Sequence, residues 1–403
     1  MTRPHVVVVG GGIVGSAVAR RLTLSDPRPD VTVVEKESAP ARHQTSRNSG
    51  VVHAGIYYAP GSAKATLSRE GVRRLRAYCR ERGLPYEEVG KVVVALDPVE
   101  VERLRGIEAR ARANGVPGLR WLGPDALREV EPHTVGLAAL HSPTTAITDF
   151  SRVAAAMLED ASDRGAQVLT GFEVTGLDQD GRRDGGQVEV RAADGRQLRA
   201  DRVVVAGGLH ADRLAVLAGD GPSPAIVPFR GEYHRLAPSA THLVRGLVYP
   251  VPDPRYPFLG VHLTRTVGGD VLLGPNAVLA TAREGYRRRD VDLEVVRALA
   301  TSSGFRRFAR ANLATGLHEV VGSVSRHAFV ARARRYVPGI TDADVVPAGA
   351  GVRAQAMDPD GSLVEDFRFS RIGGVLCIRN APSPAATASL AIADLVVDRL
   401  DLA

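Results

Sequence analysis

Three glycines near the start of the chain have the spacing of a loop that binds the pyrophosphate of a dinucleotide. Gly10, Gly12 and Gly15 form a G-x-G-x-x-G pattern that also contains Ile13 and Val14. In such loops the first glycine makes a tight turn, the second lets the backbone approach the pyrophosphate, and the third allows a helix to pack closely on a strand. The N-terminus of that helix attracts the phosphate charge. We therefore predict that these five residues belong to a dinucleotide-binding site.

A glycine pattern of this kind is informative only between a strand and a helix. Residues 6–9 are all valine, which predicts a buried parallel strand, and residues 16–24 have a helical pattern. A second predicted strand, residues 31–34, ends at Glu35. A carboxylate about 20 residues beyond the last glycine accepts hydrogen bonds from ribose hydroxyls. These elements form a complete βαβ unit, and Glu35 and Lys36 join the predicted cofactor-binding residues.

A second glycine-rich edge favours FAD over a nicotinamide cofactor. Residues 203–205 predict another buried strand, which continues into Ala206, Gly207 and Gly208. Such an edge late in a nucleotide-binding domain is more typical of flavoproteins than of nicotinamide-dependent dehydrogenases. We predict that Gly207 and Gly208 contact the cofactor, together with Val174 in the strand-rich segment before them. These residues by themselves leave NAD as an alternative.

The composition is that of a globular enzyme. At 403 residues the chain exceeds the usual size of one hydrophobic core, so two domains are expected. No apolar stretch approaches the roughly 20 residues that a membrane-spanning helix needs. The first residues lead directly into the 6–9 strand, which predicts no signal peptide, and the two cysteines exclude a disulfide framework or a cysteine-rich metal site. We expect a cytoplasmic protein without a bound metal.

The net charge of +7 comes almost entirely from arginine. Lysine occurs only at residues 36, 64 and 91, and the densest basic patches, 287–289 and 332–335, are interleaved with acidic and apolar residues. This pattern predicts a solvated, arginine-rich surface rather than a nucleic-acid interface. The alternative is attraction of anions, either acidic substrates or the lipid headgroups of a membrane that the protein contacts peripherally.

The order of the predicted elements indicates that one domain is inserted into another. We assign residues 1–80, 146–220 and 346–403 to an FAD-binding domain, and residues 81–145 and 221–345 to a substrate-binding domain. Alternating strands and helices predict a Rossmann-like α/β architecture for the first domain. The second domain is rich in β-branched residues and prolines, which predicts an antiparallel sheet.

Periodicity predicts the remaining elements. Helices are expected at residues 61–78, 98–115, 151–164, 292–321, 325–335 and 385–400, and strands at residues 91–95, 167–169 and 374–378, with a β-meander over residues 171–201. The last helix follows Asn380, Ala381 and Pro382, and the positive end of its dipole would point toward a flavin. We therefore include these three residues among the predicted cofactor contacts.

Longer blocks of sequence resemble one known family. Residues 48–62, NSGVVHAGIYYAPGS, look like the signature of L-2-hydroxyglutarate oxidases and dehydrogenases, which belong to the D-amino-acid-oxidase-like (DAO) superfamily of FAD-dependent oxidoreductases. The resemblance extends to residues 228–233, 249–254, 257–262, 274–279, 351–356 and 380–388, and so spans nearly the whole chain. It implies a two-domain α/β fold of the glutathione-reductase/DAO type with a mixed-sheet substrate domain, and FAD as the cofactor.

Three segments depart from the family pattern. Ser46 and Arg47 stand where the resemblance leads us to expect Gly-His, and His234 replaces a second tyrosine. Arg306 replaces the tryptophan of an expected Gly-Phe-Trp segment. The first two changes are expected near the active site, so they leave the choice of substrate open.

The resemblance implies oxidation of a 2-hydroxy acid to the 2-keto acid by hydride transfer to the flavin. Arg353 lies where superfamily members carry an arginine that binds the substrate carboxylate, and a guanidinium offers that group a planar, two-pronged donor. His53 and His262 are the two candidates for the base that takes the hydroxyl proton. The alternatives for His53 are a covalent link to FAD or a structural role, and for His262 a place in the packed core.

Further residues complete the predicted site. Tyr57, Arg230, Tyr233, His234 and Asn276 are expected at the substrate, with Arg230 or Tyr233 holding a second carboxylate, and Asn48, Ser49 and Gly50 are expected at the cofactor. The expected substrate is L-2-hydroxyglutarate, converted to 2-oxoglutarate, with oxygen or a quinone as electron acceptor. One alternative is oxidation of an amine, an amino acid or a tailored hydroxy acid of a biosynthetic pathway. Another is a flavin-bearing binding protein without turnover.

Overall fold

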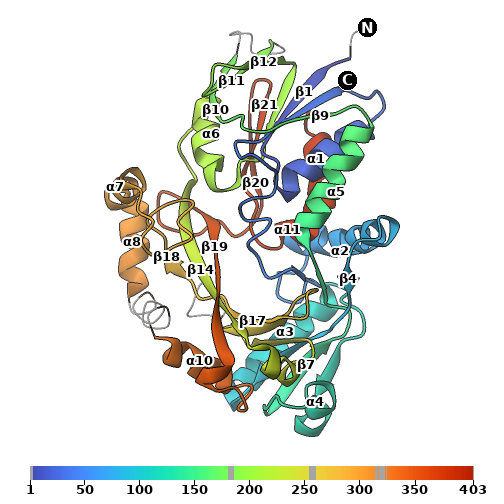
Figure 1. Cartoon of the computed structure of the whole chain (residues 1–403), viewed down its shortest axis with the longest axis vertical. Coiled ribbons are helices and arrows are strands. Elements are labelled where there is room, and N and C mark those ends of the chain that lie inside the picture. The colour runs from blue at the N-terminus through green and yellow to red at the C-terminus, as the bar shows by residue number, and fades with distance from the viewer. Residues whose placement is uncertain are drawn as a thin grey trace.

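The computed structural model describes residues 3–179, 186–253, 260–313 and 325–402, together with residues 316 and 323. Two large sheets organise this part of the chain. Figure 1 shows the first sheet at the top, beside both chain ends, and the second at the bottom. The long strands β14 (Ala225–Leu236) and β19 (Val345–Met357) run from the lower sheet toward the upper one.

The first sheet has six strands in the order β20-β21-β13-β1-β2-β9. All neighbouring strands are parallel except for β20, which is antiparallel to β21. The strands are β1 (His5–Val9), β2 (Asp30–Val34), β9 (Gln167–Leu169), β13 (Arg202–Val205), β20 (Arg368–Ile372) and β21 (Val375–Asn380). The strands predicted at residues 6–9, 31–34, 167–169, 203–205 and 374–378 are thereby confirmed.

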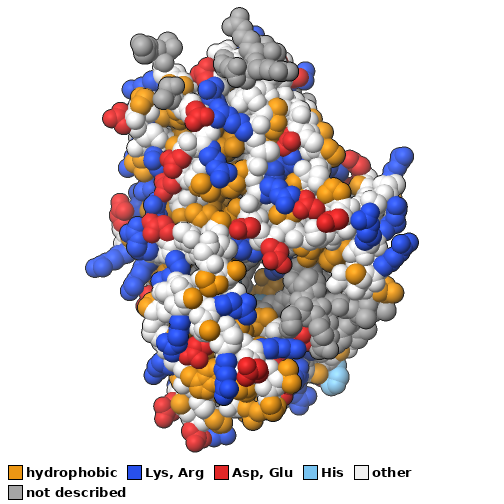
Figure 2. Space-filling model, turned by 180° about the vertical axis from the view of Figure 1, so that it is seen from behind, with side chains coloured by type: hydrophobic (Ala, Val, Ile, Leu, Met, Phe, Trp, Pro, Cys, Tyr) orange, Lys and Arg blue, Asp and Glu red, His pale blue; other side chains and the backbone are white. Residues whose placement is uncertain are grey.

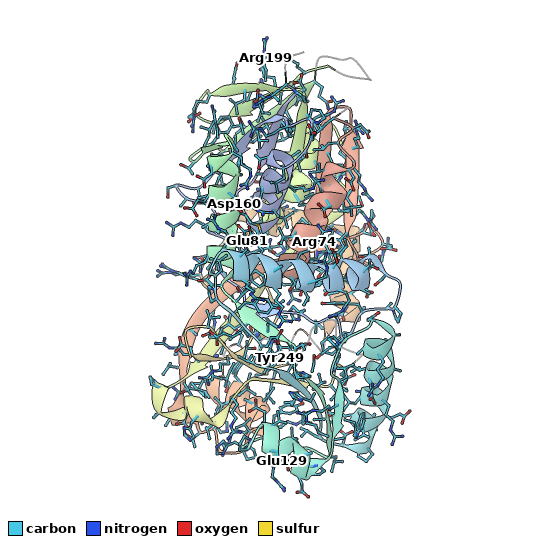
Figure 3. The ribbon with its side chains drawn as sticks, turned by 90° about the vertical axis from the view of Figure 1, so that its right-hand side faces the viewer. Arg74, Glu81, Glu129, Asp160, Arg199 and Tyr249 are labelled. Carbon is cyan, nitrogen blue, oxygen red and sulfur yellow. The ribbon has the colours of Figure 1, made fainter. Side chains whose placement is uncertain are left out.

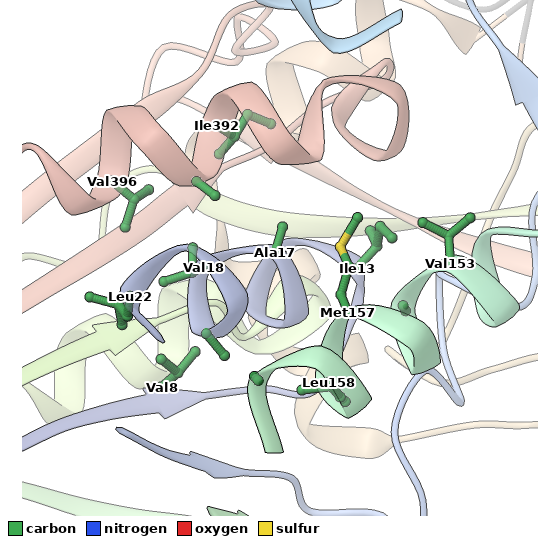
Figure 4. Close-up of a cluster of buried hydrophobic side chains, with 14 of the residues drawn as sticks. Val8, Ile13, Ala17, Val18, Leu22, Val153, Met157, Leu158, Ile392 and Val396 are labelled. Carbon is green, nitrogen blue, oxygen red and sulfur yellow. The ribbon is translucent and has the colours of Figure 1, made fainter. Parts of the chain in front are cut away.

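Three helices cover one face of this sheet. They are α1 (Ile13–Thr23), α5 (Phe150–Asp163) and α11 (Ala385–Val397). Figure 4 shows α1 packed between the other two, with Ala17 and Leu22 among its core side chains. The opposite face carries the β-meander of β10 (Val174–Gln179), β11 (Val188–Ala192) and β12 (Gln197–Ala200), together with α6 (Ala211–Leu217). The sheet is therefore buried on both faces, as its continuous valine runs require.

The second sheet has nine strands and is mixed. Its main path is β18-β14-β17-β16-β15-β5-β7-β6, and β19 pairs with β14. The strands not yet given are β5 (Lys91–Ala95), β6 (Arg120–Leu122), β7 (Ala138–Ser142), β15 (Leu247–Pro250), β16 (His262–Arg265), β17 (Val271–Gly274) and β18 (Val278–Leu279). Only β15 and β5 form a parallel pair among these described strands. The predicted antiparallel sheet is thus largely confirmed.

The remaining elements are helices and one small sheet. The helices are α2 (Ala63–Glu81), α3 (Pro98–Ala113), α4 (Pro124–Val130), α7 (Leu293–Thr301), α8 (Ser303–Ala311) and α10 (Arg326–Arg334). The small sheet contains β3 (Val51–Val52), β8 (Ala146–Thr148) and β4 (Tyr86–Glu87). Figure 3 shows α2 crossing the molecule between its upper and lower halves.

Two predictions about these elements are corrected. The helix predicted at residues 292–321 is broken at Ser302, which ends α7 and caps α8 by accepting a hydrogen bond from the Phe305 amide. The part of that prediction beyond residue 313 lies outside the described residues, apart from residue 316. Strand β19 was assigned to the FAD-binding domain within residues 346–403, yet it pairs with β14 along its length in the second sheet.

The distribution of charged side chains on the surface agrees with the expectation from the sequence. Figure 2 shows one face on which lysine and arginine side chains are spread among acidic ones, without a continuous basic patch. Cys79 and Cys377 are fully buried in α2 and β21, so their thiols pack in the core. No helix in the described part of the chain is both long and apolar enough to span a membrane.

Candidate active site

Two neighbouring cavities lie where the sheets meet. The first has a volume of about 700 Å³ and is lined by Gly10, Glu35, Lys36, Val174 and Gly207. The second has a volume of about 460 Å³ and is lined by His53, Tyr57, Tyr233, His262 and Arg353, with Asn380, Ala381 and Pro382 at its edge. Gly12, Gln44, Thr45, Ala206 and Gly208 line both, so the two cavities share a boundary.

The glycines of the G-x-G-x-x-G loop fit a dinucleotide. Gly10 has φ +107°, and a Cβ there would lie 2.6 Å from the Ala206 carbonyl oxygen, so the turn requires glycine. A Cβ on Gly15 would lie 1.9 Å from the Gly10 carbonyl oxygen, which shows how closely α1 approaches β1. The N-terminal residues of α1, Ile13 and Val14, line the second cavity, so the positive end of the helix dipole is directed toward it.

Glu35 lies at the end of β2, where a ribose-binding carboxylate is expected. It is 8% exposed and lines the first cavity. Its carboxylate accepts hydrogen bonds from the Gly11 amide at 2.8 Å and the Glu37 amide at 3.0 Å, which fix its orientation. The first cavity therefore suits the adenosine half of FAD, and the second suits the flavin half together with a substrate.

The structure places most predicted cofactor residues at these cavities, but two differ. Asn48 and Ser49 line the second cavity, whereas neither cavity is lined by Gly50, whose φ of +73° only turns the chain near Thr148. Gly15 also lies outside both cavities because it packs against Gly10. In this structure both glycines shape the backbone beside the cavities and do not line them, unlike the other predicted cofactor residues.

Alternation along β14 decides which predicted substrate residues reach the second cavity. Phe229, Gly231 and Tyr233 line it, since successive side chains of a strand point to opposite faces of the sheet. Arg230 points to the other face, where it lies 3.3 Å from a carboxylate oxygen of Glu232. The structure therefore places Arg230 outside the cavity in which we predicted it.

His234 also lies on the outer face of the sheet. Its ring packs on Phe329 with the centroids 4.5 Å apart, and it does not line the cavity. The structure therefore places His234 outside the cavity in which we predicted it. Asn276 lines the cavity, but its amide accepts from the Glu232 backbone N–H and donates to the Glu232 carboxylate, at 2.7 and 3.1 Å.

Arg353 faces the cavity from β19. It is paired with Phe229 of β14, so both side chains lie on the cavity face of the sheet. The Arg353 side chain is surrounded by protein, and its solvent-accessible surface faces the cavity. Tyr233, on the same face, lies close enough for its charge state to affect Arg353. A guanidinium in this position can bind a carboxylate that enters the cavity.

His53 and His262 lie near each other and near Arg353. The His53 amide donates to Thr387 Oγ1 at 3.1 Å, and Ser68 Oγ donates to the His53 carbonyl oxygen at 3.1 Å, which fixes the backbone. Burial lowers the pKa of His53 well below its usual range, and the nearby charges of Lys91, His262 and Arg353 lower it further. This histidine is therefore neutral at neutral pH.

The tautomer of His262 follows from its hydrogen bond. Nδ1 lies 2.9 Å from the Gly260 carbonyl oxygen, so Nδ1 carries the proton and Nε2 keeps its lone pair. Burial lowers the pKa of His262 to about 4, while that hydrogen bond acts in the opposite direction. A neutral imidazole with a fixed tautomer is suited to accept a proton.

Sequence reasoning missed two residues of this region, Tyr249 in the cavity wall and Lys91 packed behind it. Lys91 is 1% exposed, and its Nζ lies 4.1 Å from the ring centroid of Tyr249 and 5.2 Å from that of Tyr57. Tyr249 lines the second cavity and stacks on His262 with the centroids 4.1 Å apart. In Figure 3 Tyr249 lies below α2, in the lower half of the molecule. The sequence feature that could have revealed Lys91 is a lysine at the start of a buried valine strand, in a chain with only two other lysines.

One group of metal-type ligands occurs among the described residues, beside the first cavity. It consists of Glu37, His43 and Glu284. Lys36 Nζ lies 2.5 Å from a carboxylate oxygen of Glu37 and 2.7 Å from one of Glu284, so an ammonium already compensates both carboxylates. These contacts join the loop after β18 to the end of β2 beside the cofactor cavity.

Comparison with known proteins agrees with this geometry. The family model described as FAD dependent oxidoreductase (DAO) matches residues 5–399. The chain belongs to this family. FAD is therefore its cofactor, and the sequence-based assignment of family, cofactor and DAO-type α/β fold with a mixed second sheet is confirmed.

Relatives and solved structures of this FAD-dependent oxidoreductase refine the comparison. It is 43% identical over 407 residues to human mitochondrial L-2-hydroxyglutarate dehydrogenase, covering 98% of this chain and 88% of the relative. It is 42% identical over 394 residues to L-2-hydroxyglutarate dehydrogenase of Escherichia coli K12, covering 98% and 92%. Dithionite-reduced L-α-glycerophosphate oxidase from Mycoplasma pneumoniae with FAD bound has a TM-score of 0.78 at 22% identity, covering 100% of this chain and 95% of that one.

Proposed function

We propose that this FAD-dependent oxidoreductase oxidises L-2-hydroxyglutarate to 2-oxoglutarate. The observation that carries the proposal is the second cavity, where Arg353, His53 and His262 meet beside the cofactor cavity. The identity of 42–43% to L-2-hydroxyglutarate dehydrogenases over nearly the whole chain supports the same substrate. The amino-acid-oxidising proteins that share the fold, such as glycine oxidase from Geobacillus kaustophilus at 20% identity, support the fold alone.

The residues that line the cavity have different roles in the proposed reaction. Arg353 holds the C1 carboxylate through two parallel N–H···O bonds, which orients the hydroxyl-bearing carbon. A neutral histidine, His262 or His53, accepts the hydroxyl proton. FAD, when bound, supplies the acceptor for the hydride. Tyr57 Oη is buried and has no hydrogen-bond partner among the described residues, so it is available to a ligand.

Anaerobic reduction of the flavin tests this function. L-2-Hydroxyglutarate is expected to bleach the flavin absorbance faster than D-2-hydroxyglutarate, L-lactate, glycine or L-proline. An amine donor lacks the hydroxyl proton that the base must remove, so it is expected to react slowly. Faster bleaching by an amino acid would instead support an amine oxidase. A flavin that no hydroxy acid or amino acid bleaches would indicate a binding protein.

Arg353→Ala is expected to lower kcat/KM for L-2-hydroxyglutarate by roughly ten- to 150-fold. The range follows from about 1.5–3 kcal/mol for a hydrogen bond to a charged group, at about 1.4 kcal/mol per decade. Arg353→Lys is expected to recover only part, because an ammonium lacks the two-pronged geometry. Flavin content should remain normal. Wild-type kinetics in Arg353→Ala would place the carboxylate site elsewhere.

FAD is expected to be held without a covalent bond. The sequence around His53 resembles the hydroxyglutarate family more than the branch that links FAD through histidine. Acid precipitation should therefore release yellow FAD into the supernatant. Flavin that stays with the denatured pellet would indicate a covalent link, and a His53→Ala variant that then releases it would identify the attachment site.

We infer that the electron acceptor is oxygen or a quinone and that the protein acts in the cytoplasm, in contact with a membrane if a quinone is used. Reoxidation of the reduced protein by dissolved oxygen and by a short-chain quinone, compared at equal concentrations, separates the two acceptors. Binding to anionic and neutral vesicles tests the membrane contact, since electrostatic attachment requires anionic lipid and weakens with salt.

A further inference from the structure

Lys91 is a buried cation without an acidic counterpart in the described structure. It begins β5, is 1% exposed, and makes no ion pair with any described carboxylate. Its ammonium lies over the ring faces of Tyr249 and Tyr57. Burying an unpaired charge is costly, so such a residue is expected to serve a purpose other than folding.

Strand register places Lys91 on the cavity face of the second sheet. Strand β15 lies between β5 and β16, and Leu247 of β15 is paired with both Lys91 and Thr264. Tyr249 and His262 lie two residues further along their strands, on the same face as these pairs. Lys91, Tyr249 and His262 therefore come from three adjacent strands, with the Tyr249 ring between the ammonium and the imidazole.

The two cations of the site act on the same histidines. The charges of Lys91 and Arg353 both lower the pKa of His53 and of His262. Both cations consequently lie close to the group that would face the reacting carbon. Tyr57 adds a buried hydroxyl with no partner among the described residues, beside the Lys91 ammonium. The cavity wall thus offers Arg353 on one side and Tyr57 Oη on another, and the Lys91 ammonium lies directly behind Tyr57 and Tyr249.

We propose that Lys91, together with Tyr57, recognises the second carboxylate of the substrate and so makes the site selective for dicarboxylates. This inference rests on the proposed function, which places the first carboxylate at Arg353. It replaces Arg230, which the strand alternation turns away from the cavity. A dicarboxylate brings one negative charge to Arg353 and one to Lys91. When a monocarboxylate binds at Arg353, the charge of Lys91 is not compensated.

Substitution of Lys91 tests the inference. Lys91→Met has a similar volume and removes a buried charge, so the variant should fold and keep its flavin. We expect it to lower the ratio of kcat/KM for L-2-hydroxyglutarate to that for L-2-hydroxybutyrate by roughly ten- to a hundredfold. Lys91→Arg should keep part of the ratio. Lys64→Met is the matched control, because Lys64 also faces a tyrosine ring, Tyr58, but has the carboxylates of Glu365 and Asp366 nearby to compensate its charge.

Binding of glutarate and butyrate gives a readout independent of turnover. Shifts in the flavin absorbance should show that the wild type prefers glutarate and that Lys91→Met has lost the preference. An unchanged preference would overturn the inference. Equal losses for dicarboxylates and monocarboxylates would also overturn it and would mean that Lys91 acts through the histidines. If the wild type prefers glutarate but is not reduced by L-2-hydroxyglutarate, the proposed function fails and the role of Lys91 stands.

The pH dependence of glutarate binding gives a further check. Burial lowers the pKa of Lys91 to about 7, so the ammonium is lost as pH rises above this value. His53 and His262 stay neutral from pH 6 to 9, and Arg353 stays charged. Burial raises the pKa of Tyr57, Tyr58, Tyr233 and Tyr249 above the usual range, so these phenols stay un-ionised. Glutarate affinity should therefore fall above pH 7 in the wild type but not in Lys91→Arg. A fall of equal size in both would contradict the inference.

Discussion

Gly12→Val is expected to give a folded but colourless protein. Gly12 has φ −76° and ψ 177°, an extended conformation that valine adopts readily. A Cβ at this position would meet only Thr45 Oγ1 within 4 Å among the described residues, at 3.3 Å. The added side chain would therefore project into the boundary that the two cavities share, where the pyrophosphate must lie. The ratio of flavin absorbance to protein measures the loss, and turnover should disappear with it.

The other glycines of the loop provide a contrast. A side chain on Gly10 or Gly15 would meet backbone oxygen atoms at 2.6 and 1.9 Å, so those variants should lose folded protein as well as flavin. Gly106→Val is the matched control, because a Cβ there meets nothing within 4 Å in the described chain. Circular dichroism separates loss of fold from loss of flavin. Full flavin occupancy in Gly12→Val would show that the pyrophosphate binds elsewhere.

The cofactor site was largely predictable because it depends on local sequence. The turn at Gly10, the helix after it and the carboxylate of Glu35 all lie within one βαβ unit, whose strand and helix periods are visible in the sequence. Gly15 and Gly50 show the limit of this reasoning. The need for glycine at both positions was predictable from the sequence. Whether these residues contact the cofactor depends on which side of the loop faces the cavity.

The substrate site depends on pairing between distant strands. Arg230 and Arg353 were both plausible ligands for a carboxylate, and only the pairing of Phe229 with Arg353 shows which one shares the cavity face. A shift of one residue in the register of a strand exchanges its two faces. The sequence of β14 therefore could not show that Tyr233 faces inward while His234 packs on Phe329.

Lys91 was overlooked because its neighbours come from distant parts of the chain. Tyr57 precedes it in a loop, and Tyr249 follows it in β15, so neither contact is visible as a local pattern. A lysine before three valines also reads as the exposed end of a strand. Its burial follows from the parallel pairing of β5 with β15, which places the start of β5 inside the molecule.

His262→Asn is expected to slow anaerobic flavin reduction by L-2-hydroxyglutarate by roughly 10²- to 10⁴-fold, the range that general base catalysis contributes. The hydrogen bond between Nδ1 and the Gly260 carbonyl oxygen leaves Nε2 as an acceptor. Asparagine preserves the polar character of the position but cannot take up a proton. Stopped-flow measurement of the reduction rate at saturating substrate separates this step from binding. His53→Asn, at the second candidate, is the comparison.

The pH dependence of the same rate distinguishes the two histidines from an ordinary imidazole. Because burial lowers the pKa of His262 to about 4, its basic form persists as pH falls through 6.5, where a solvent-exposed histidine would gain a proton. The reduction rate in the wild type should therefore show no decline from histidine protonation between pH 8 and 5.5. If His53→Asn is slowed much more than His262→Asn, the base is His53, and the hydrogen bond with Gly260 then serves to hold the His262 ring against Tyr249.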